Sequence, residues 1–144
     1  MHLAAYRSND INRSSIDTDM KIALTSLYVD NPEKAFRFYT EVLGFVEKLH
    51  VPEAQLAIVA SSEEFDGPGL LLEPNSNPIA GTYQKDLFSA GIPVIVFGVD
   101  DIQKEYLRLK DHGVVFRGEP RATEWGTQTL FEDTCGNLIQ LHQA

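Results

Sequence analysis

The chain has 144 residues, the length of one ordinary domain that can bury its own core. Its net charge of −9 argues against nucleic acid and anionic membranes as partners and would suit a cationic ligand. No apolar run approaches the roughly 18 residues that cross a bilayer, and the first residues lack the layout of a signal peptide. The single cysteine, Cys135, excludes an internal disulfide and fits a reducing compartment, so we expect a cytoplasmic protein.

The first 20 residues differ from the rest of the chain. Residues 7–19 are polar and show little hydrophobic periodicity. We therefore expect residues 1–20 to form a flexible arm ahead of a single domain over 21–144.

The first regular pattern begins at Lys21. The apolar, partly β-branched run from Ile22 to Val29 predicts a strand. Asn31-Pro32 gives a helix cap followed by proline at the first helical position, and Gly44 is typical of the end of that helix. Three further strands are expected at 45–51, 55–60 and 69–73.

The second half of the chain repeats this order after a linker over 74–91, in which a short helix is expected at 83–89. The expected elements are a strand at 93–99, a helix at 101–112, and strands at 113–117, 127–132 and 138–142.

Val29-Asp30 and Val99-Asp100 mark the repeat, and each pair precedes an amphipathic helix, a glycine and a new strand. A repeat of this length predicts two similar modules that cover one another's open faces. We therefore predict an α+β fold of two tandem βαβββ modules, at about 21–74 and 92–142, which form an open barrel that contains a cleft.

Four segments resemble those of one family: 29–45, 99–114, Leu72-Glu73-Pro74, and the closing 133–139. Together they resemble the vicinal oxygen chelate superfamily, which includes glyoxalase I, extradiol dioxygenases and bleomycin-binding proteins, over about residues 21–142. The resemblance implies that each module forms half of an open barrel with the ligand inside. It also implies a homodimer.

Members of that family that use a metal place His or Gln and Glu ligands on the first and last strands of each module. The corresponding positions here are Leu24, Val94, Leu70 or Leu71, and Gln140. Aliphatic side chains bind no metal, so three of these four positions offer no ligand. We therefore expect no metal cofactor, although a divalent metal held by other residues remains an alternative.

Strand alternation then predicts which side chains line the cleft. An apolar basin with a few hydrogen-bonding groups suits a small organic molecule, on which Trp125 and Tyr28 would stack. The expected cleft residues are Leu24, Ser26, Tyr28, Leu70, Leu72, Val94, Val96, Trp125, Thr127, Gln140 and His142.

Other reactive side chains have plainer explanations. His142 would be a metal ligand or a general base, but a histidine at the cleft rim is favoured. Glu73 is expected to face away from Leu70 and Leu72. Cys135 has no neighbouring base in sequence, which disfavours a catalytic thiol. The aromatic residues of the first helix are interpreted as core.

Three functions stay open, and whether the chain is an enzyme is undecided. The favoured one is metal-free binding of a small organic molecule, as in the bleomycin-resistance branch. The second is a metal-dependent lyase or dioxygenase-like enzyme built on ligands such as Glu73, Gln140 and His142. The third is an interaction module whose cleft serves dimer assembly.

Overall fold

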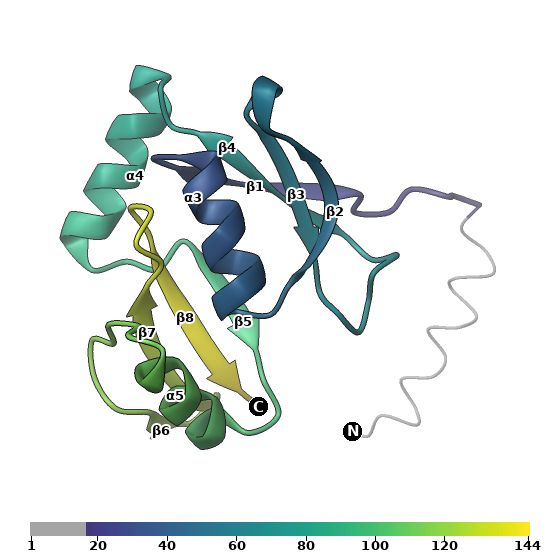
Figure 1. Ribbon diagram of the computed structural model, residues 1–144. Helices are drawn as coiled ribbons and strands as arrows, with labels where there is room; N and C mark the ends of the chain where they lie inside the picture. Colours follow the sequence, from purple (N-terminus) through teal and green to yellow (C-terminus); the bar gives the residue numbers. More distant parts are fainter. Residues whose placement is uncertain (1–16) are drawn as a thin grey trace.

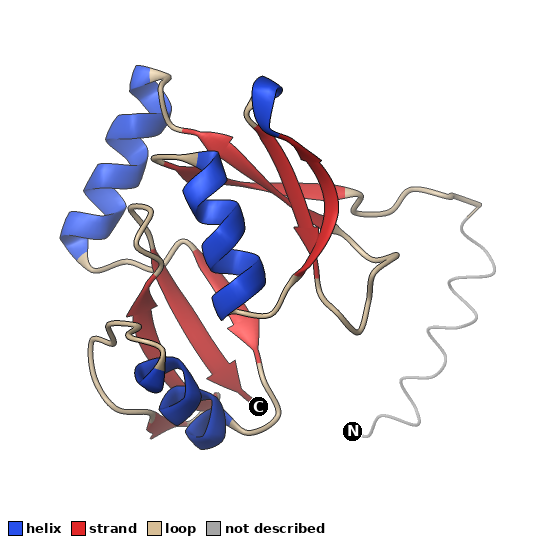
Figure 2. Cartoon of the chain, viewed as in Figure 1, coloured by secondary structure: helices blue, strands red, loops and turns tan. Residues whose placement is uncertain are grey.

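The computed structural model describes residues 17–144 as two four-stranded sheets with helices packed on them (Figures 1 and 2). Sheet A has the strand order β1 (Leu24–Val29), β4 (Gly69–Pro74), β3 (Leu56–Ala60) and β2 (Val46–Val51). Sheet B has the order β5 (Ile95–Gly98), β8 (Leu138–Gln143), β7 (Gly126–Glu132) and β6 (Arg121–Thr123). Of the predicted arm over 1–20, residues 1–16 lie outside the described part.

The two sheets have the same internal pairing. In each, the first strand runs parallel to the last strand of its module, and the other neighbours are antiparallel. This arrangement confirms the predicted α+β fold of two βαβββ modules, although the sheets are not closed into a barrel. Within residues 17–144, no helix has the length and apolar character that crossing a membrane requires.

The first helix begins as its sequence predicts. The Asn31 side chain accepts hydrogen bonds from the backbone N–H groups of Glu33 and Lys34, at 3.0 and 3.1 Å, which satisfies donors that have no partner inside the helix. The helix α3 (Pro32–Arg37) continues as a π-helical turn, η1 (Phe38–Val42). Gly44 ends the segment with φ +94°, a conformation that glycine adopts without strain.

The linker contains a longer helix than expected. Helix α4 (Pro78–Ala90) begins at Asn77, whose side chain accepts a hydrogen bond from the Ile79 N–H at 2.8 Å. It ends at Gly91, in the left-handed region with φ +74°.

The second module differs from the prediction at one strand. Helix α5 (Ile102–Asp111) is present with Asp101 as its cap, but the strand expected at 113–117 is wrong. That segment forms one isolated bridge, between Phe116 and Phe131, rather than a ladder. The strand that completes sheet B is β6, which pairs with β7 as a hairpin around Trp125 and Gly126.

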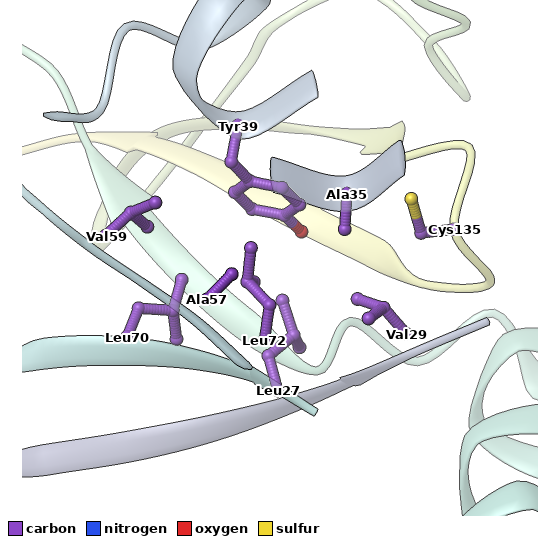
Figure 3. Close-up of a cluster of buried hydrophobic side chains, with 9 residues drawn as sticks. All are labelled: Leu27, Val29, Ala35, Tyr39, Ala57, Val59, Leu70, Leu72 and Cys135. Atoms are coloured by element: carbon purple, nitrogen blue, oxygen red, sulfur yellow. The ribbon is translucent and has the colours of Figure 1, made fainter. Parts of the chain in front are cut away.

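Helices cover one face of each sheet. Leu27, Val29, Leu70 and Leu72 point from sheet A toward Tyr39 of η1 in a closely packed cluster (Figure 3). A second cluster joins α5 to sheet B, and its buried members are Ile102, Leu109, Val114, Phe131, Ile139 and Leu141. Side chains that pack against both clusters, such as Phe38, Leu43 and Phe97, make the two modules one body.

A buried polar network also ties the modules together. The fully buried Asp133 carboxylate accepts hydrogen bonds from the Tyr39 hydroxyl at 2.7 Å, the Cys135 N–H at 2.7 Å and the Asn137 amide at 2.9 Å. Gln84 of α4 donates to the carbonyl oxygens of Tyr28 and Cys135 at 2.9 and 3.1 Å. These contacts fix the β7–β8 turn of the second module against the first. We use the name junction network for these five residues: Tyr39, Gln84, Asp133, Cys135 and Asn137.

Candidate functional site: the open sheet faces

Each sheet has a second face that no helix within residues 17–144 covers. Along β1, Leu27 and Val29 are buried, whereas Leu24 is 45% exposed and Ser26 is also exposed. Along β5, Val96 is 54% exposed although Phe97 packs into the core. Because successive side chains of a strand point to opposite faces, these exposures define an open face on each sheet.

The register of sheet A shows which residues share its open face. Ser26 lies opposite Leu71 and Tyr28 opposite Glu73, so Leu71 and Glu73 point to the same side as Ser26 and Tyr28. The open face of sheet A therefore carries Leu24, Ser26, Tyr28, Leu71 and Glu73. It combines apolar surface with one hydroxyl, one phenol and one carboxylate.

The two cleft residues predicted on β4 lie elsewhere. Leu70 and Leu72 are 7% and 0% exposed and belong to the helix-covered core, so the expectation that they face the cleft is wrong (Figure 3). The same one-residue error placed Glu73 on the wrong side. The physical reason is that Leu70-Leu71-Leu72 is an unbroken apolar run, which carries no alternation to show which side chains point inward.

The open face of sheet B is more polar. Val96 lies opposite Gln140, and His142 lies opposite Gly98 on one side and Gln128 on the other. The Gln140 side-chain amide donates to the Gln128 side-chain oxygen at 3.2 Å. The predicted residues Val96, Gln140 and His142 thus share one surface, together with Gln128.

Thr127 and Val94 are placed differently from the prediction. Thr127 lies opposite Gln143, and its neighbour Gln128 lies opposite His142. Because neighbouring side chains of a strand point to opposite faces, Thr127 points away from the open face of sheet B. The sequence prediction chose Thr127 for the cleft and so missed its neighbour Gln128. Val94 precedes β5 and is partly buried against both core clusters. Trp125 is 77% exposed in the β6–β7 turn.

His142 is held close to this turn. A Cβ atom at position 126 would lie 3.0 Å from two atoms of the His142 ring, so the ring occupies space that only glycine leaves free. The Nδ1 atom of His142 is buried and has no hydrogen-bond partner among the described residues. A buried polar atom without a partner costs free energy, which a ligand or water that bonds to it would recover.

The resemblance implies that Leu24, Val94, Gln140 and either Leu70 or Leu71 stand at the positions of the metal ligands. The strand register decides the choice between Leu70 and Leu71, because Leu71 lies opposite Ser26 just as Gln140 lies opposite Val96. Three of the four are aliphatic and offer no donor atom to a metal. Among residues 17–144, no group of three or more His, Cys, Asp or Glu side chains is placed to hold a metal ion.

The other histidines have local partners. The His50 ring stacks on Phe36 with 3.9 Å between ring centroids, and its Nε2 lies 3.0 Å from the Glu33 carboxylate. His112, at the end of α5, has its Nδ1 2.9 Å from the carbonyl oxygen of Arg108. Both contacts are consistent with structural roles.

Cys135 sits in the junction network and has the character of an inert thiol. Burial, followed by the nearby Asp133 carboxylate, raises its pKa to about 12. A thiol with this pKa is almost entirely protonated near neutral pH and is a poor nucleophile. The same two causes, burial first, raise the pKa of the Tyr39 hydroxyl well above its usual value.

Comparison with known proteins supports the fold and its family. Residues 21–141 match the family model described as the Glyoxalase/Bleomycin resistance protein/Dioxygenase superfamily. The chain is 50% identical over 126 residues to the uncharacterized protein YurT of Bacillus subtilis (strain 168), a match that covers 86% of this chain and 99% of the relative. The B. subtilis protein YetH, also uncharacterized, is 32% identical over 127 residues, covering 85% of this chain and 98% of YetH.

Two solved structures share both fold and moderate sequence identity. UcmS2 is 27% identical with a TM-score of 0.71, over 87% of this chain and 98% of that one. TnmS3, described as an antibiotic binding protein from Streptomyces sp. CB03234, is 27% identical with a TM-score of 0.66, over 89% of this chain and 98% of that one.

Proposed function

The chain belongs to the glyoxalase/bleomycin resistance protein/dioxygenase superfamily, and we propose that it binds a small organic molecule against its open sheet faces without a metal centre. The observation that carries this proposal is the contrast between the faces. Leu24 and Leu71 give the open face of sheet A apolar surface, whereas Gln128, Gln140 and His142 give that of sheet B hydrogen-bonding groups.

Such a combination fits the usual chemistry of small-molecule sites. Apolar walls supply most of the affinity, and a few polar groups fix the orientation of the ligand. His142 supports this interpretation because it shares the open face of sheet B with Gln128 and Gln140, whose side-chain amides form a hydrogen bond. The aliphatic residues at three of the four metal-ligand positions support binding without a metal.

The relationship to TnmS3 supports the class of function but not the ligand. TnmS3 is described as an antibiotic binding protein, and its 27% identity extends over 89% of this chain. We infer a planar or amphipathic organic molecule as the ligand class, since one sheet face offers apolar contact and the other offers hydrogen bonds.

We further propose that a second copy of the chain completes the site. In the described part of the chain, β1 pairs only with β4 and β5 pairs only with β8, so one edge of each strand has no ladder partner. Unpaired edges beside exposed apolar side chains favour association. A homodimer would enclose the open face of one sheet against that of another.

The proposal is tested with N-phenyl-1-naphthylamine, a neutral aromatic probe with one N–H donor whose fluorescence rises in apolar surroundings. We expect the wild-type chain to bind it in the presence of EDTA. Val96→Glu places a charge on the open face of sheet B and should weaken binding about tenfold or more, because a buried charge beside an apolar ligand is unfavourable.

A matched control is Leu107→Glu, since Leu107 is 58% exposed and Val96 is 54% exposed, but Leu107 lies on helix α5, outside both open faces. The control should bind the probe as the wild type does. Equal loss in both variants, or binding only after a divalent metal is added, would contradict the proposal. Light scattering should give a particle mass twice the 16.1 kDa of one chain.

A further inference from the structure

A separate cavity of about 990 Å³ lies between the two modules. Phe45, which follows η1, and Phe97, from β5, line it, together with the loop after β3 and the start of α5. Phe97 points to the side of sheet B opposite Val96, and Leu109, Phe131 and Leu141 of the core cluster also border the cavity. The cavity therefore lies on the helix-covered side of sheet B, not on its open face.

The inner wall of the cavity is aromatic. The rings of Phe45 and Phe97 meet edge to face, with centroids 4.9 Å apart at an interplanar angle of 64°. Tyr39 lies behind them, with its ring centroid 6.2 Å from that of Phe45 and 6.3 Å from that of Phe97. Aromatic rings provide both apolar contact and attraction for a cation placed over a ring face.

The rim of the cavity is acidic. Asp101 is occupied as the cap of α5, where it accepts a hydrogen bond from the Lys104 N–H at 3.1 Å, and Glu105 forms an ion pair with Arg108. Glu63, Glu64 and Asp100 are exposed and form no ion pair among the described residues. Of the described residues that line the cavity, Lys104 alone is basic.

The aromatic wall and the acidic rim together indicate one class of ligand. No three of the described carboxylates, histidines or thiols are placed to hold a metal ion, so these rim charges do not form a chelating site. An aromatic wall under a negative rim instead matches a bulky organic cation, whose apolar body contacts Phe45 and Phe97 while its charge stays near the carboxylates. The volume is in the range of sites for drug-sized molecules.

We propose that this cavity, which we call the inter-module cavity, is a second binding site, selective for bulky organic cations. It goes beyond the site on the open sheet faces, because it uses other residues on the other side of sheet B. Its selectivity comes from Glu63, Glu64 and Asp100, and its apolar contact comes from Phe45 and Phe97.

The test compares two probes of the same shape and opposite charge, tetraphenylphosphonium and tetraphenylborate, by titration calorimetry of the full chain. We expect the cation to bind at least about tenfold more tightly than the anion. The triple variant Glu63→Gln/Glu64→Gln/Asp100→Asn should lose about tenfold in affinity for the cation. The matched control Glu41→Gln/Glu53→Gln/Asp86→Asn removes three exposed carboxylates elsewhere and should lose less than about threefold.

Amide chemical shifts locate the bound cation and separate this site from the open faces. The expected shifts lie at Gly44, Phe45 and residues 97–101, and Val96→Glu should leave the affinity for the cation nearly unchanged. Shifts centred on Ser26 and Gln140, equal losses in the two triple variants, equal binding of both probes, or no binding of the cation would overturn the inference. Each of these results leaves the N-phenyl-1-naphthylamine test of the open faces intact.

Discussion

The junction network and the open face of sheet B contain similar polar side chains, but the two sets differ in how completely they are hydrogen-bonded. At the junction, the Asp133 carboxylate accepts hydrogen bonds from Tyr39, Cys135 and Asn137, and Gln84 bonds to backbone carbonyl groups. On the open face, within residues 17–144, the Gln140 side chain bonds only to the Gln128 side chain, and the Nδ1 of His142 has no partner.

This contrast separates polar groups that hold the fold from polar groups that do not. A fully satisfied buried network gives rigidity and a unique arrangement, and each member is costly to remove. A buried polar atom without a partner lowers stability unless another molecule bonds to it. Residues of the junction network should therefore control the free energy of unfolding, and residues of the open face should control binding.

The largest effect is expected for Asp133→Ala. The change leaves the Tyr39 hydroxyl and the backbone N–H groups of Cys135 and Asn137 buried without an acceptor, so the free energy of unfolding should fall by about 3–5 kcal/mol. Urea denaturation measures this loss. The exposed Asp111→Ala serves as control and should stay within about 0.5 kcal/mol of wild type. A loss below about 1 kcal/mol for Asp133→Ala would show that the network does not stabilise the junction.

A smaller loss is expected for Tyr39→Phe, which removes one hydrogen bond to Asp133 but keeps the ring. The free energy of unfolding should fall by about 1.5–3 kcal/mol, because the bond is made to a charged group in a buried site. Tyr83→Phe, on the exposed side of α4, is the matched control and should change stability by less than about 0.5 kcal/mol. Equal effects in both variants would contradict the assigned role of the Tyr39 hydroxyl.

Alkaline pH should weaken the junction. The folded-state pKa of Cys135 is raised from 9.0 to about 12, so the thiol contributes stability below pH 9 that is lost as the pH rises toward 12. In this window the unfolded state releases the proton first, and stability should fall by about 1 kcal/mol per pH unit. Urea unfolding at pH 8 and at pH 10.5 measures the slope. Cys135→Ala should give a shallower slope, and an unchanged slope would exclude Cys135 as its source.

The smallest effect is expected on the open face. His142→Leu removes a polar atom that has no partner, so the free energy of unfolding should stay equal or rise by up to about 1 kcal/mol. Asn137→Leu, in the junction network, is the contrasting variant and should destabilise the chain by about 2 kcal/mol or more. A clear destabilisation by His142→Leu would mean that His142 holds the fold rather than a ligand.

The sequence predicted those features that have a local signal. The cap at Asn31, the glycine stops and the repeat of a strand followed by a helix all depend on neighbouring residues, and the structure confirms them. The face of β4 could not be inferred, because Leu70-Leu71-Leu72 is apolar throughout. The prediction therefore assigned Leu24, Ser26 and Tyr28 to the side of sheet A on which they lie, but it missed Leu71 and Glu73 on that side.

The junction network had no local signal at all. Gln84 bonds to the carbonyl group of Tyr28, 56 residues away, and Tyr39 bonds to Asp133, 94 residues away. Such contacts depend on the packing of the two modules, which propensity and periodicity do not describe. The prediction of a strand at 113–117 in place of β6 has a similar cause. Residues 113–117 have strand-like composition, but they form only one bridge with β7.

If this chain binds its ligand without a metal centre, the purified protein should retain almost no metal, and the retained amount can be measured. The purified chain would be equilibrated with Zn²⁺, Ni²⁺, Mn²⁺ or Fe²⁺, dialysed, and analysed for bound elements by mass spectrometry. With leucine, valine and leucine at three of the four ligand positions, we predict far less than one retained metal per chain. About one tightly held metal per chain would contradict the account and would indicate a metal-dependent enzyme.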